Sequence, residues 1–177
     1  YLLMDRYGLS PAVAGLALTG AAVFWSIGSA IQGRMGETLA NERAMFIGAV
    51  LGVIAIAVVW GTAALHWPAF VAIGIWALGG AGMGLVFPRK NVHMIKLSTA
   101  LNQGFNSSAL AISDSMGSAL ALASGGLIFA AFSGNDSFVA VFAFTTLIGL
   151  ALIILTPRTR PSATANSALE ASNRLEA

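Results

Sequence analysis

Residues 44–88 read AMFIGAVLGVIAIAVVWGTAALHWPAFVAIGIWALGGAGMGLVFP, a run without Asp, Glu, Lys or Arg. An α-helix rises about 1.5 Å per residue, so about 20 apolar residues cross the ~30 Å hydrocarbon core of a bilayer. The run is too long for one such helix and fits two. His66-Trp67-Pro68 marks the break, because an interfacial aromatic residue precedes a proline that favours a helix start. The stretch predicts two membrane-spanning helices, near residues 44–65 and 68–87.

Uncharged stretches on either side of this run predict three more spans. One begins at Ser10-Pro11, where a capping hydroxyl precedes a proline suited to the first helical position. The three spans are expected near residues 11–31, 101–132 and 138–155. The sequence thus predicts an all-α integral membrane protein with five transmembrane helices. Residues 157–177 are rich in Pro, Ser, Ala and Asn, and we expect them to form a mostly disordered tail.

The composition of the whole chain points to the same environment. Apolar residues make up 57% of the 177 residues, charged residues make up 9%, and the mean hydropathy is +0.82. A soluble domain carries about 25% charged residues because its surface faces water. So few charges cannot cover a water-facing surface, and most of this surface is expected to face a lipid bilayer.

The residue content also disfavours several kinds of site. The chain has no cysteine, which removes disulfides, thiolate metal sites and thiol nucleophiles. His66 and His93 have no acidic or histidine neighbour at ligand spacing, so we expect neither a metal nor a cofactor. The net charge is only +2, and no aromatic residues are interleaved with the basic ones. Nucleic acid is therefore not an expected partner.

Basic residues are distributed unequally between the two sides of the predicted spans. Eight Lys and Arg residues fall in segments that share one side, and Arg6 stands alone on the other. Cytoplasmic segments are enriched in Lys and Arg, so the amino terminus is predicted to lie outside and the carboxyl terminus in the cytoplasm. With no signal-peptide pattern in the first nine residues, we expect an earlier helix. The chain is then interpreted as the C-terminal part of a longer membrane protein.

Residues 101–132 differ from the other spans because they carry polar residues along one helical face. On a 3.6-residue period, one stripe collects Gln103, Asn106, Ser107, Ser113, Asp114, Gly117, Ser118, Ser124 and Gly125. Asp114 is the one charge inside a predicted span, and a carboxylate in hydrocarbon costs at least ~2.5 kcal/mol. The stripe is therefore expected to face the bundle interior or a wet cavity.

Several motifs along the chain occur in an order found in a known family. Residues 3–34, LMDRYGLSPAVAGLALTGAAVFWSIGSAIQGR, contain a G-x-S-x-x-x-A-G-L opening at Gly8 to Leu16. This stretch resembles the external loop and eighth helix of bacterial major facilitator superfamily transporters of the drug-efflux type. The loop from Gly33 to Arg43 resembles a degenerate copy of the family's Gly/Asp/Arg loop motif, without its D-R-x-G-R arrangement. Residues 79–89 and 102–126 resemble the tenth and eleventh helices of actinobacterial members.

The resemblance implies a fold and a function. The five spans would correspond to the eighth to twelfth helices, and the missing N-terminal half of the same transporter would be the main partner. The whole protein would move small molecules across the bacterial plasma (inner) membrane by alternating access, with proton-coupled efflux as the expected mode. A non-transporting membrane scaffold or a vestigial fragment is the alternative.

Enzyme activity is not expected. An intramembrane aspartyl protease needs two aspartates within its spans, and the predicted spans contain one. An intramembrane serine protease needs a histidine within its spans, but His66 and His93 fall in predicted turns or loops.

The polar stripe supplies most candidate functional residues. Asp114 is expected to relay protons during transport, to make a structural hydrogen bond to a neighbouring helix, or to lie near the lipid headgroups if the span is set differently. Other stripe residues are expected to line a substrate cavity or to hydrate the mouth of a helix; they are Gln103, Asn106, Ser107, Ser113 and Ser118.

Three arginines form a second group of candidates. Arg34, Arg43 and Arg89 follow or precede predicted spans on the basic side of the chain. They are expected to anchor cytoplasmic loops and to fix the orientation, with a part in a conformational gate as the alternative.

Overall fold

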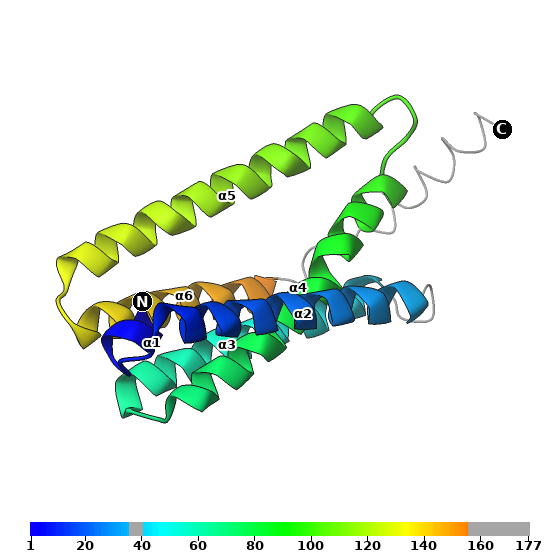
Figure 1. Ribbon diagram of the computed structural model, residues 1–177. Coiled ribbons are helices and arrows are strands. Elements are labelled where there is room, and N and C mark those ends of the chain that lie inside the picture. The colour runs from blue at the N-terminus through cyan, green and yellow to red at the C-terminus, as the bar shows by residue number, and fades with distance from the viewer. Residues whose placement is uncertain (36–40, 156–177) are drawn as a thin grey trace.

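The computed structural model describes residues 1–35 and 41–155, which form a helical bundle with one long helix beside it (Figure 1). Its helices are α1 (Leu2–Asp5), α2 (Pro11–Met35), α3 (Asn41–Leu65), α4 (Ala69–Lys96), α5 (Gln103–Ala131) and α6 (Asn135–Leu155). Within these ranges, five helices are long and apolar enough to cross a membrane, which confirms the predicted fold class. The predicted tail at residues 157–177 lies outside the described residues.

Short polar and proline signals define several helix ends. Ser10 Oγ accepts a hydrogen bond from the Val13 amide at 3.4 Å, and Pro11 takes the first position of α2, as the sequence predicts. His66, with φ of 62°, makes the turn before Pro68 and α4. Gly134, with φ of 60°, makes the turn between α5 and α6 without the penalty that a side chain would add.

Three helices extend beyond the apolar spans expected from the sequence: α2 at its end, α3 at its start and α4 at its end. The largest error is α4, which was expected to end near Phe87 but continues through Pro88 to Lys96. The arginines of the predicted loops consequently lie in helices: Arg34 in the last turn of α2, Arg43 in the first turn of α3, and Arg89 within α4. The physical reason is that an apolar span and its helix are different lengths, because a helix continues past the hydrocarbon into the polar interface.

Glycines allow α2 and α3 to pack closely on opposite sides of α4. A Cβ at Gly28 or Gly80 would overlap a backbone carbonyl oxygen of the facing helix, at Ala81 or Ala21 respectively. Gly82 approaches α3 in the same way: a Cβ there would lie 2.7 Å from the Gly48 carbonyl oxygen. Close backbone packing of this kind is a main source of helix association in a bilayer. Burying apolar side chains between helices does not stabilise their association there, because lipid tails are equally apolar.

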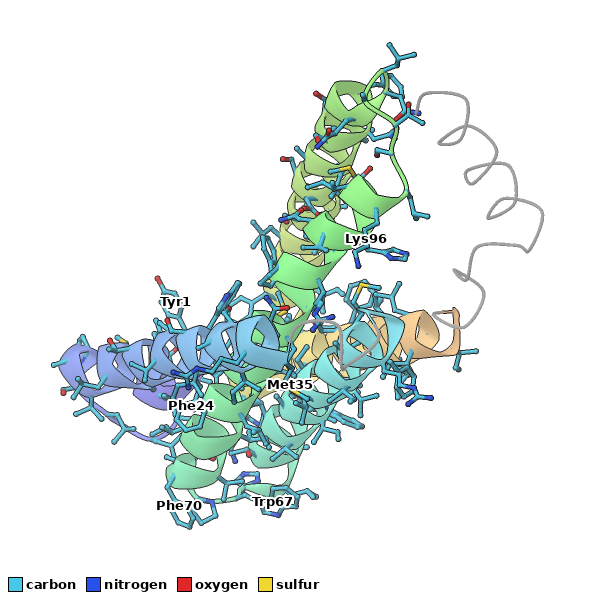
Figure 2. The ribbon with its side chains drawn as sticks, turned by 90° about the vertical axis from the view of Figure 1, so that its right-hand side faces the viewer. Tyr1, Phe24, Met35, Trp67, Phe70 and Lys96 are labelled. Atoms are coloured by element: carbon cyan, nitrogen blue, oxygen red, sulfur yellow. The ribbon has the colours of Figure 1, made fainter. Side chains whose placement is uncertain are left out.

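A polar network ties the helices together at the end that contains the α3–α4 turn. The Arg6 guanidinium donates to Asn135 Oδ1, and Asn135 Nδ2 donates to the Ala63 carbonyl oxygen at 3.1 Å. Tyr7 Oη donates to the Trp67 carbonyl oxygen at 2.5 Å. Figure 2 shows Trp67 at this end, while Lys96 lies far from it at the other end of α4. The first residues, α3 and α6 are thus joined by side chains, and α2 continues from the same end.

The helix α5 stands apart from α2, α3 and the first part of α4 (Figure 1). None of its residues is buried, whereas α4 alone buries five. It contacts α6 through Phe129 and Phe138, whose ring centroids are 5.2 Å apart. Its remaining neighbour is the last part of α4, which leads into the α4–α5 turn.

Candidate functional site

The polar stripe of α5 faces α4 and α6, the side of the bundle that its periodicity indicates. Asn106 Nδ2 donates to Ser98 Oγ at 2.8 Å in the α4–α5 turn. Ser107 Oγ lies 3.9 Å from the sulfur of Met94 on α4. At the other end of α5, a Cβ on Gly125 would lie 4.0 Å from a Val141 methyl group on α6. The opposite face of α5 is apolar and exposed, with Leu120 and other large side chains on it.

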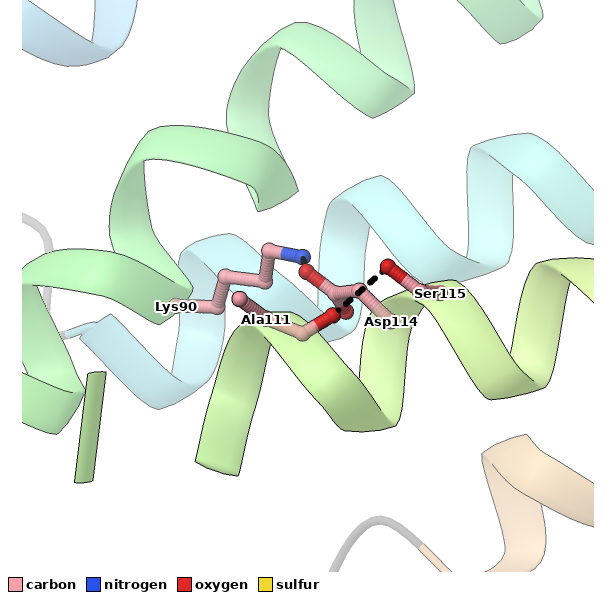
Figure 3. Close-up of polar contacts among 4 residues, drawn as sticks. All are labelled: Lys90, Ala111, Asp114 and Ser115. Atoms are coloured by element: carbon pink, nitrogen blue, oxygen red, sulfur yellow. Dashed lines mark hydrogen bonds and ion pairs between the residues drawn. The ribbon is translucent and has the colours of Figure 1, made fainter. Parts of the chain in front are cut away.

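At the centre of the stripe, Asp114 forms an ion pair with Lys90 of α4 (Figure 3). The Lys90 side chain is 19% exposed and the Asp114 side chain is 45% exposed, so water or another part of the protein can reach the carboxylate. Lys90 Nζ also lies 3.9 Å from the centroid of the Phe87 ring. The pair joins two membrane-spanning helices by opposite charges, each of which alone would be costly in lipid.

The other predicted stripe residues do not gather around this ion pair. Asn106 holds the α4–α5 turn through Ser98 and also donates to Asn102 Oδ1 at 3.3 Å. Gln103, Ser113 and Ser118 are exposed along α5. The structure brings Asp114 to a charged partner and places Asn106 in a structural contact.

Of the three predicted loop arginines, only Arg89 is buried, with 4% of its surface exposed. Its Nε donates to Gln32 Oε1 at 2.7 Å, and its Nη2 donates to the Gln32 carbonyl oxygen at 3.3 Å. Gln32 lies in the last turn of α2, where carbonyl groups lack helical partners and favour a cation. Arg34 and Arg43 are exposed. Arg89 therefore links α4 to the end of α2.

Lys90 is the residue that sequence reasoning missed, because the predicted span ends near Phe87, where the uncharged run stops. A signal was nonetheless present. Residues 91–96, NVHMIK, contain neither glycine nor a second proline, so nothing in them stops a helix. Continuing α4 through this segment would have placed Lys90 within a span and made it a candidate partner for Asp114.

Two apolar cavities lie along α2, at a distance from the charges. The first has a volume of about 520 Å³ and lies between α1, α2, α4 and α6. The second has a volume of about 410 Å³ and lies between α2, α3 and α4. Leu18 and Trp76 line both, so the two cavities adjoin. Neither lining includes a charged side chain among the described residues, and such walls suit an apolar molecule.

Metal-binding residues are not clustered in this part of the protein. Within residues 1–35 and 41–155, no group of three or more His, Asp or Glu side chains is placed to hold a metal ion. The chemistry that the described residues offer is therefore that of charge pairs, hydrogen bonds and apolar surfaces.

A comparison with protein families identifies the chain. The family model described as Major Facilitator Superfamily matches residues 1–175, which is almost the entire sequence. No curated protein and no solved structure matches the chain in the corresponding comparisons. The match agrees with the five long apolar helices within the described residues. The chain belongs to the major facilitator superfamily, a family of membrane transporters rather than enzymes.

Proposed function

We propose that the chain is part of a proton-coupled secondary transporter that exports small amphipathic molecules by alternating access. The observation that carries this proposal is the ion pair between Lys90 and Asp114, which joins two membrane-spanning helices on the polar face of α5. Charged side chains within spans are costly in lipid, and those that face protein or water commonly belong to an ion or substrate pathway.

The ion pair has two states that differ in charge. While Asp114 is ionised, its carboxylate attracts the Lys90 ammonium and holds α4 and α5 together. A proton that binds Asp114 cancels the negative charge, and most of the attraction between the helices is lost. Because 45% of the Asp114 side chain is exposed, a proton can reach it from a wet cavity while α5 stays folded. Proton binding at Asp114 would then alternate with contact between α4 and α5.

The two adjoining cavities along α2 support an amphipathic cargo. Their walls consist of apolar side chains, with Trp76 and Leu18 at the junction. Ligand sites are typically apolar cavities with a few polar groups that fix orientation. Such walls would accept the apolar body of a molecule and would disfavour a highly charged one.

The exposure of α5 supports the proposal that further helices complete the protein. No residue of α5 is buried, and Gln103, Ser113 and Ser118 of its polar stripe are exposed in the part of the chain that the structure describes. A polar intramembrane face is stable against protein or a wet cavity, and an apolar one against lipid. We therefore place the N-terminal half of the same transporter against the polar stripe, so that two bundles rock about a site between them.

The proposed setting is a bacterial inner membrane, with the amino terminus outside and the carboxyl terminus in the cytoplasm. Two basic residues support this orientation: Arg34 lies in the last turn of α2, and Lys96 lies in the last turn of α4. These turns end on the same side of the membrane, because Arg89 contacts Gln32 there. Clustered Lys and Arg at span ends favour the cytoplasmic side.

The test uses the full-length transporter that contains this chain. Asp114→Asn keeps the size of the side chain and its hydrogen-bonding capacity but removes the charge. Proton-driven transport into inverted membrane vesicles, measured across pH and normalised to folded protein, should fall at least about tenfold. The matched control is Asp136→Asn, which removes the acidic residue from the first turn of α6 and should leave transport nearly unchanged.

The alternative is a membrane scaffold in which Asp114 only holds helices together. That role predicts normal activity and an unchanged pH profile for Asp114→Asn, together with a loss of folded protein for Asp114→Leu. This pair of results would refute proton coupling at Asp114.

A further inference from the structure

Pro88 lies inside α4 and leaves one backbone carbonyl of the helix without its usual donor. Proline has no N–H, so Gly84, four residues earlier, cannot receive its helical hydrogen bond from this position. In a bilayer no water replaces that bond, and an unsatisfied backbone group is costly there. Ser29 of α2 supplies the missing donor: its Oγ donates to the Gly84 carbonyl oxygen at 3.3 Å.

The absence of a side chain at Gly84 makes this hydrogen bond feasible. A Cβ at Gly84 would overlap the Trp25 carbonyl oxygen and would lie 2.8 Å from the Ser29 amide nitrogen. Gly84 therefore brings the backbones of α2 and α4 together at the position where α4 lacks a donor. The short Ser29 side chain can then reach across.

The residue after the proline is also bonded to α2. Arg89 donates to the side chain and the carbonyl oxygen of Gln32, which is three residues after Ser29 and on the same side of α2. Thus α2 contacts α4 immediately before and immediately after Pro88. These contacts hold one particular geometry at a point where the helix has lost an internal bond.

Beyond this point α4 leads away from α2 and α3. Figure 1 shows the last part of α4 leaving the bundle and leading to the α4–α5 turn. The segment after Pro88 also carries Lys90, which is bound to Asp114 on α5. Any change of direction at Pro88 would therefore move the Lys90 ammonium and α5 together.

We propose that Pro88 is a hinge between a fixed unit, made of α2, α3 and the part of α4 before it, and an arm made of residues 89–96 and α5. Ser29 and Arg89 are positioning residues that set the angle of this hinge. The Ser29 hydroxyl acts by replacing the hydrogen bond that Pro88 removes, so its effect depends on the proline. The hinge goes beyond the proposed transport function. It is tested by distances within the protein and not by transport, so the hinge and the proposed function can each fail without the other.

The experiment measures the distance between the fixed unit and the arm in the full chain. Because the chain has no cysteine, spin labels attach only at introduced sites, for which we choose Ile47 on α3 and Phe105 on α5. Both side chains are exposed, at 44% and 77%. Electron spin resonance in lipid nanodiscs then gives the distribution of distances between the labels.

Ser29→Ala should raise the population of longer distances about threefold, which corresponds to about 0.6 kcal/mol, the typical strength of a hydrogen bond between membrane helices. Ser29→Thr keeps the hydroxyl and should restore the original distribution. The matched control is Ser26→Ala, because Ser26 Oγ donates to Ala22 within α2 and does not reach α4.

The decisive comparison makes Ser29→Ala in a variant that also carries Pro88→Ala. Pro88→Ala returns an N–H to α4, which can then donate to the Gly84 carbonyl oxygen. In that background Ser29→Ala should leave the distances unchanged. An equal effect of Ser29→Ala with and without Pro88, or no effect in either background, would overturn the hinge.

Discussion

The backbones of Gly28 and Ala81 touch across the interface between α2 and α4, because Gly28 has no side chain to separate them. Gly28 is buried, and so is Gly80, which makes the equivalent contact with Ala21 in the opposite direction. Each helix thus supplies a glycine against the other's backbone. The reciprocal arrangement fixes both the distance between the two helices and their register.

Gly28→Ala should therefore destabilise the bundle by about 1–3 kcal/mol, because backbone atoms cannot move aside as a flexible side chain can. The measurement is the fraction of folded chain during unfolding by sodium dodecyl sulfate in mixed micelles. Gly20→Ala is the matched control on the same helix, since an added Cβ at Gly20 meets no atom within 4 Å. Equal stability of the two variants would show that the close contact does not hold α2 to α4.

Arg89→Ala should also destabilise the chain, by about 1–3 kcal/mol, because it leaves Gln32 Oε1 without the donor it has in the folded protein. Arg34→Ala is the comparison, since Arg34 lies near the same end of α2 but is exposed. Its effect should stay within about 0.5 kcal/mol, as for most surface changes. The same unfolding assay measures both. If the two arginines matter equally, Arg89 contributes through charge alone and not through its contact with α2.

The sequence predicts the fold well where composition and local signals decide the structure. Uncharged runs give the five spans, and Ser10-Pro11 gives the start of α2 with its capping contact. The sequence does not predict that α4 continues past Phe87 and through Pro88, a residue that is unfavourable within an isolated helix. Ser29 of α2 donates to the Gly84 carbonyl oxygen that Pro88 leaves without a donor, and no local pattern reveals a donor that is 55 residues away.

At the candidate site, too, the sequence indicates local features but not the contacts between helices. Periodicity singles out Asp114 on the polar stripe of α5, and the structure brings this residue to Lys90 of α4. Its partner was missed because Lys90 was assigned to a loop, although the two side chains meet in the structure. A pair between helices depends on where both helices end, and those ends follow from tertiary contacts as well as from sequence.

Removing Lys90 should affect stability only while Asp114 remains charged. Lys90→Met leaves the Asp114 carboxylate without its partner and should lower the free energy of unfolding by on the order of 1 kcal/mol. The effect is this small because both side chains are partly exposed and solvent screens their charges. Lys90→Met combined with Asp114→Leu removes both charges and should recover most of that loss. Unfolding in mixed micelles at neutral pH gives the coupling between the two positions. Additive losses in the double variant would mean that the pair does not stabilise the contact between α4 and α5.

The orientation in the membrane can be tested at two exposed turns, Ala100 between α4 and α5 and Ser133 between α5 and α6. Since α5 separates them and is long enough to cross a membrane, the two turns should lie on opposite sides. The excess of Lys and Arg on the Ala100 side predicts that this turn is cytoplasmic. Because the chain has no cysteine, single cysteines at these positions can be labelled selectively with a membrane-impermeant thiol reagent. In intact cells Ser133→Cys should react at once, whereas Ala100→Cys should react only after the membrane is permeabilised. The reverse order of labelling would invert the proposed topology, and labelling of both in intact cells would show that α5 does not span the bilayer.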